Sequence, residues 1–195
     1  MKIDQPSDDF IDLTQVKLEL QRFIDQKEPW QEPPCPGCTE HTPQKCSPQC
    51  VDAPGALSID SVRYPLEEHV VAMVYELNAT RLFKSCWSCE GHLRGSSNTL
   101  WKVPQVCFYS QAAIYPKLIS SYLGKLFIKK SIHYQWNLFI SEISQSIYPT
   151  YCIRPDLNQE SEASLDLLQQ DLKAISKNLH SQLKFEAREL LKSIK

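Results

Sequence analysis

The amino-acid sequence lacks several features that would assign a protein to a broad class at once. It contains no apolar run near the roughly 20 residues that a membrane-spanning helix needs. Its net charge of −2 gives no overall attraction to nucleic acid or to an anionic membrane. Internal repeats, a P-loop, a dinucleotide-binding glycine motif and a nucleophile elbow are also missing. These absences argue against a membrane protein, a charge-driven nucleic-acid-binding protein and the common nucleotide-binding enzymes.

An apolar secretion signal is missing as well, because residues 1–6 are polar and acidic. We therefore expect a cytoplasmic protein whose eight cysteines lie in a reducing compartment. In that setting, clustered thiols bind metal or perform redox chemistry more often than they form disulfides. With 195 residues, of which 42% are hydrophobic, the chain can form one domain with appendages or two small domains.

The apolar periodicity predicts four regions. They are an acidic amphipathic helix within residues 1–34 that Ser7 would cap, a loop rich in cysteine and proline at 35–54, a body at 55–157, and a long helix within 158–195. In the body, we predict helices from Pro65 to Asn78 and over 114–131, and strands over 81–88, 103–110, 134–143 and 149–154. Two hairpins with helices over one face imply an α+β two-layer sandwich of mainly antiparallel strands.

The loop at 35–54 carries two cysteine pairs, in the patterns CxxC and CxxxC. Its prolines interrupt regular structure, and it has too little apolar content to become ordered by burial. Four thiolates around one zinc ion would order it, because metal-binding free energy then contributes to folding. We predict a zinc site made of Cys35, Cys38, Cys46 and Cys50. His41 as a substitute ligand, an iron–sulfur cluster and a linker with free thiols are the alternatives.

A second cluster of metal-ligating residue types spans residues 84–92. A regular strand would place Cys86 and Cys89 on opposite faces, but a bend at Gly91 would let both converge with His92. If the following loop is centred between residues 96 and 97, opposed residue numbers sum to 193. Cys107 would then face Cys86 and lie close enough to ligate the same ion. The predicted ligands are Cys86, Cys89, His92 and Cys107.

Two classes of function fit this second cluster. If the zinc sites are closed, the protein is a metal-stabilised binding or adaptor module. The alternative is a zinc-dependent hydrolase with Glu90 as general base and Arg94 binding an anionic group. Thiol redox chemistry at Cys86 and Cys89 is less favoured, because the strand–CxxC–helix context is missing. A zinc deaminase is excluded, because the His-x-Glu motif of that class does not precede the PCxxC motif at residues 34–38.

The terminal helices are the predicted sites of self-association or of a protein partner. A continuous helix over 162–194 would be about 50 Å long, which is more than the body needs. Its second half is therefore expected to pair with the N-terminal helix, with another copy or with another protein. The helix at 114–131 presents lysines that form either a modest anion-binding patch or a solvated basic face, with the latter favoured: Lys117, Lys125, Lys129 and Lys130.

Overall fold

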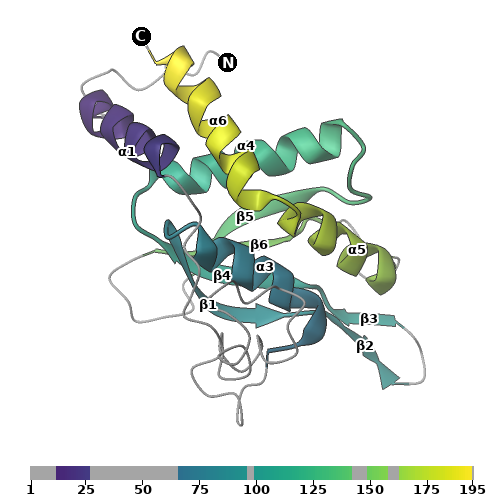
Figure 1. The fold of residues 1–195 in the computed structure, drawn as a ribbon. Helices are drawn as coiled ribbons and strands as arrows, with labels where there is room; N and C mark the ends of the chain where they lie inside the picture. Colours follow the sequence, from purple (N-terminus) through teal and green to yellow (C-terminus); the bar gives the residue numbers. More distant parts are fainter. Residues whose placement is uncertain (1–11, 27–65, 96–98, 142–148, 158–162, 195) are drawn as a thin grey trace, which may run out of the picture.

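The computed structural model describes residues 12–26, 66–95, 99–141, 149–157 and 163–194. They form the predicted α+β fold, in which helices lie over one face of a four-stranded antiparallel sheet (Figure 1). The strand order is β1-β4-β6-β5, with β1 at Phe83–Cys89, β4 at Gln105–Ser110, β6 at Thr150–Pro155 and β5 at Trp136–Ser141. A separate two-stranded sheet pairs β2, His92–Arg94, with β3, Thr99–Lys102. Among the described residues, none of the helices combines the length and the apolar composition that spanning a membrane would require.

The core lies between the sheet and its helices. Val106, Phe108 and Ile153 of the two central strands are fully buried, as their alternating positions predict. Helix α3 (Glu68–Ala79) covers the sheet with its apolar face, which includes Met73 and Leu77. Helix α4 (Ile114–Ile128) contributes further fully or nearly fully buried side chains: Tyr115, Leu118, Ile119 and Leu123.

The C-terminal segment is two helices and not the continuous helix that the sequence predicts. Helix α5 spans Leu165–Ser176 and helix α6 spans Leu179–Ser193. Asn178 lies between them with φ of +58°, a left-handed conformation that asparagine adopts more readily than most residues. The break redirects the chain, so α6 packs into the core with Leu183 and Ala187 fully buried.

The second half of the C-terminal segment pairs with the N-terminal helix, one of the three partners considered for it. Helix α1 (Leu13–Asp25) lies along α6 (Figure 1). Its N-cap is Asp12, whose side chain accepts a hydrogen bond from the amide of Gln15, whereas Ser7 lies outside the described residues.

The numbers of paired residues sum to 193, as predicted, at two places between β1 and β4. Arg94 pairs with Thr99 in the small sheet, and Ser85 pairs with Phe108 in the large one. Residues 93–102, expected to be a loop, therefore hold most of the antiparallel pair of β2 and β3. The expected pairing of Cys86 with Cys107 is wrong, because a β-bulge at Cys86 shifts the register and makes Trp87 the partner of Cys107.

Candidate metal centre

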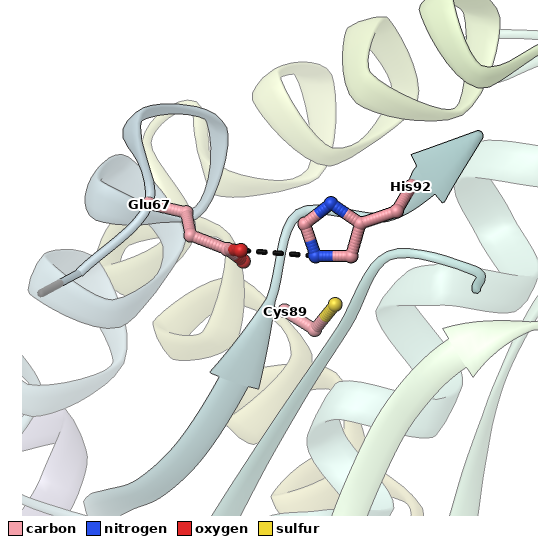
Figure 2. Close-up of side chains that lie close together, drawn as sticks. All are labelled: Glu67, Cys89 and His92. Atoms are coloured by element: carbon pink, nitrogen blue, oxygen red, sulfur yellow. Dashed lines mark ion pairs between the residues drawn. The ribbon is translucent and has the colours of Figure 1, made fainter. Parts of the chain in front are cut away.

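Three side chains from different elements converge at the end of β1. Glu67 is the N-cap residue of α3, Cys89 is the last residue of β1 and His92 is the first residue of β2. One ligand atom from each lies within 4.8 Å of the other two. Figure 2 shows the three side chains pointing toward one another.

Gly91 makes this convergence physically achievable. Its φ is +86°, and a Cβ atom there would lie 2.6 Å from Leu165 Cδ1 and 2.8 Å from Pro104 Cδ. Only glycine adopts this conformation without strain, and only glycine fits the space. The bend that the sequence predicts at Gly91 is therefore present, and it brings His92 back toward Cys89.

Hydrogen bonds to neighbouring elements fix the carboxylate of Glu67. Glu67 Oε1 lies 3.0 Å from His92 Nε2 (Figure 2). Glu67 Oε2 accepts a hydrogen bond from the amide of Glu90 at 2.7 Å. The Glu90 carboxylate in turn accepts a hydrogen bond from the amide of His69 at 3.0 Å, in the first turn of α3. The Gln169 side chain donates to the Glu90 carbonyl at 3.1 Å. The cluster is thus braced against both α3 and α5.

The Cys89 thiol is only 4% exposed. Burial raises its pKa, the negative charges of Glu67 and Glu90 add to that rise, and a hydrogen bond from the Gly91 amide lowers it. The neutral thiol is therefore the resting form, and a bound cation would displace its proton. The side chains of His92 and Glu67 are 37% and 32% exposed, so the site opens to solvent on their side.

The structure brings together Cys89 and His92 of the predicted ligands and adds Glu67, which the sequence reading missed. The 21 residues between Glu67 and Cys89 include all of α3, so no short spacing motif links them. One signal could have found Glu67. It is an acidic residue directly before the predicted helix, and that helix leads into the strand with the CxxC motif.

The other predicted site residues lie elsewhere. Cys86 is exposed in the bulge, and Cys107 is fully buried with its Sγ 2.7 Å from Cys152 Sγ, so neither is in the group around Glu67. The Glu90 carboxylate is directed to the helix amide, and Arg94 is exposed on β2. The four cysteines predicted to bind zinc between residues 35 and 50 lie outside the described residues.

The donor set of the group suits zinc. A carboxylate oxygen, a thiolate sulfur and an imidazole nitrogen are all common zinc ligands, and their mixture of hard and soft atoms disfavours magnesium or calcium. Three protein ligands leave one position of a tetrahedral ion for water or another group.

The chain matches no protein-family model and no curated protein sequence. A comparison with solved structures finds the PH1069 protein from Pyrococcus horikoshii, with a TM-score of 0.35 and 13% sequence identity over 73% of this chain and 90% of that chain. A similarity at this level carries no functional argument.

Proposed function

We propose that Glu67, Cys89 and His92 bind a zinc ion and that the protein is a metal-stabilised binding or adaptor module of the cytoplasm. The observation that carries the proposal is the approach of three ligand atoms to within 4.8 Å of one another from α3, β1 and β2. An ion there would join the N-terminus of the helix to the end of the sheet. A reducing compartment, expected from the sequence, would keep the thiol available.

The second part of the proposal is the four-cysteine site of residues 35–50. Its support is the spacing of the two cysteine pairs in a segment with little apolar content. The two sites would differ in kind, because four thiolates fill the coordination of zinc and the three ligands of the central group do not.

A zinc-dependent hydrolase is the second candidate, and the partial exposure of His92 and Glu67 favours it, since it leaves a solvent-facing position on a bound ion. In that case Arg94 would bind an anionic group, and Glu90 would be the general base. The geometry favours the structural role, because the Glu90 carboxylate already accepts the His69 amide and faces the helix N-terminus.

Thermal unfolding with and without added zinc tests the proposal. A ligand that binds only the folded state stabilises it by about 2.7 kcal/mol at 100 times its Kd. We expect zinc to raise the Tm of the wild type and to have a smaller effect on His92→Ala. An equal rise in both proteins would contradict zinc binding at this site.

Cobalt substitution separates the two candidate functions. Co²⁺ replaces zinc in such sites and reports its coordination through visible absorption. If water occupies the fourth position, added azide will change the spectrum, and the hydrolase gains support. If a protein group closes the site, azide will leave the spectrum unchanged, as the structural role predicts.

A further inference from the structure

A second group of thiols lies farther along the sheet and contains none of the three proposed zinc ligands. Cys107 of β4 and Cys152 of β6 are directly paired across the two central strands, and Cys86 lies in the bulge of β1, next to Trp87, which pairs with Cys107. All three are free cysteines. Cys107 and Cys152 alternate with Val106 and Ile153, so their side chains point to the face of the sheet away from the helix-covered core.

The two central thiols are in contact. Cys107 Sγ lies 2.7 Å from Cys152 Sγ, with Cys107 as donor, and Cys152 Sγ lies 3.4 Å from the side-chain oxygen of Gln105. A disulfide requires an S–S distance of about 2.05 Å and Cβ atoms about 3.5–4.5 Å apart. Directly opposed residues of an antiparallel pair have Cβ atoms about 4.5–5.5 Å apart, so a small approach of the two side chains closes the bond.

The surroundings give the two thiols different chemistry. The hydrogen bond from Cys107 lowers the pKa of the Cys152 thiol against the opposing effect of burial, and the positive charge of Arg154 also lowers it. The same contact, together with burial, raises the pKa of Cys107. Cys152 is therefore the better nucleophile and the better leaving group of the pair.

Access to the three thiols also differs. Cys107 is 0% exposed and Cys152 is 3% exposed, whereas Cys86 is exposed. Cys86 interacts electrostatically with both buried thiols. The charge of Cys86 raises the pKa of Cys107, and the charge of Cys152 raises the pKa of Cys86. A large thiol reductant would thus meet Cys86 first.

We propose that Cys107 and Cys152 form a redox-active dithiol that hydrogen peroxide oxidises to a disulfide, and that Cys86 is the exposed thiol through which a small-molecule thiol reduces it. Neither the zinc site nor the adaptor function is needed for this chemistry.

Oxidation takes two steps. The Cys152 thiolate attacks one oxygen of the peroxide, the O–O bond breaks, and the hydroxide that leaves takes a proton to become water, which gives a sulfenic acid on Cys152. The Cys107 thiol then attacks the Cys152 sulfur, and the S–O bond breaks with loss of a second water. In total, two thiols and one peroxide give one disulfide and two waters.

Reduction proceeds through the surface. The Cys86 thiolate attacks the Cys107 sulfur and releases Cys152, because the sulfur with the lower pKa leaves more readily. Glutathione attacks the exposed Cys86 sulfur of the mixed disulfide and frees Cys107. A second glutathione then attacks the Cys86–glutathione disulfide, which restores the Cys86 thiol. Two glutathione thiols are oxidised to one glutathione disulfide for each protein disulfide that is reduced.

Peptide mapping after oxidation tests the dithiol. The full chain is treated with hydrogen peroxide, free thiols are blocked with N-ethylmaleimide under denaturing conditions, and disulfide-linked peptides are identified by mass spectrometry. We expect a Cys107–Cys152 link in the wild type and in Cys86→Ser. Recovery of both cysteines as blocked thiols, or a link from Cys152 to another cysteine, would overturn the proposal. The wild-type protein alone decides this, so the result does not depend on whether Cys107→Ser or Cys152→Ser folds.

The rate of reduction tests the part assigned to Cys86. The oxidised wild type and the oxidised Cys86→Ser variant are mixed with reduced glutathione, and the loss of the disulfide is followed over time. We expect the variant to be reduced at least about tenfold more slowly, because glutathione must then reach a buried sulfur. Equal rates would remove Cys86 from the pathway.

Discussion

Cys86 and Cys89 are separated by only Trp87 and Ser88 on β1, yet the structure gives them different neighbours. Cys89 meets a carboxylate and an imidazole at a solvent-facing edge of the fold. Cys86 lies on β1 next to β4, which carries Cys107, and the buried Cys107 is in contact with the buried Cys152 of β6. Mixed oxygen, nitrogen and sulfur donors suit a zinc ion, whereas adjacent thiols alone also suit disulfide chemistry. The comparison shows that the elements packed around a cysteine, more than its local motif, determine its chemistry.

The backbone produces this division. The bulge at Cys86 makes Trp87 the partner of Cys107, and the bend at Gly91 returns the chain so that His92 reaches Cys89. A substitution near Cys89 should therefore leave the thiol pair of Cys107 and Cys152 unchanged, and a substitution of Cys86 should leave zinc binding unchanged.

The largest expected effect comes from Gly91→Ala. The new Cβ would overlap Leu165 and Pro104 in a backbone conformation that alanine disfavours, so we expect a loss of about 2–4 kcal/mol in the free energy of unfolding and loss of zinc binding. Urea denaturation measures the first effect. Gly95→Ala is the matched control, because φ there is also positive, at +45°, but no atom lies within 4 Å of the added carbon. If the two variants lose the same stability, close packing at Gly91 is not what constrains the bend.

Glu67→Gln should selectively weaken the metal end of the strand. It removes the charge of a proposed ligand and of the partner of His92, so we expect zinc affinity to fall by about 10–100-fold in competition with a chromophoric chelator. Glu68→Gln, on the next residue of the helix and exposed, should leave affinity unchanged. The Cys107–Cys152 disulfide should form equally well in both variants. An equal loss of affinity in the two variants would point to a general effect of helix charge.

Zinc should change the pH range over which Cys89 affects stability, and also the sign of that effect. Because the folded state raises the pKa of Cys89 above its ordinary value of 9.0, the unfolded chain loses that proton first. Without zinc, this thiol therefore makes the free energy of unfolding decrease as pH rises through that range. With zinc, the ion displaces the same proton, so affinity should rise about tenfold per pH unit below the thiol pKa. Chemical denaturation at several pH values, with and without zinc, measures both slopes, and Cys89→Ser should lose both.

Glu90→Gln is expected to have the smallest effect. The amide oxygen of glutamine can still accept the His69 amide, and only the charge at the helix N-terminus is lost, which is worth about 0.3–1 kcal/mol. Zinc affinity should change by less than about threefold, since the Glu90 side chain is not a ligand and acts on Cys89 only through its charge. Retention of metal and fold together with the complete loss of a measured hydrolytic activity would instead support Glu90 as a general base.

The sequence predicts much of the fold because most elements carry strong local signals. Apolar periodicity and turn residues predicted α3, α4 and the four strands of the main sheet. The predicted centre of one loop gave the correct partners of Ser85 and Arg94. The break at Asn178 was missed, because the leucine spacing continues through it and only packing against α1 and α4 redirects α6. The bulge at Cys86 was also missed, since an added residue in a strand has no signal of its own in the local sequence.

The candidate site was predictable only where its residues are neighbours in the sequence. Cys89, Gly91 and His92 belong to one short motif, so their convergence follows from local geometry. Glu67 comes from a distant segment, and its proximity to Cys89 depends on how α3 packs against β1. No spacing rule for a single segment contains that information.

The most direct test of the central claim is the zinc content of the purified protein under reducing conditions, measured by elemental analysis for the wild type, Cys89→Ser and Cys86→Ser. The two variants carry the same substitution on the same strand, but only Cys89 belongs to the group with Glu67 and His92. We predict that Cys89→Ser loses one zinc equivalent relative to the wild type and that Cys86→Ser loses none. Equal zinc in Cys89→Ser and the wild type, or an equal loss in both variants, would contradict the assignment.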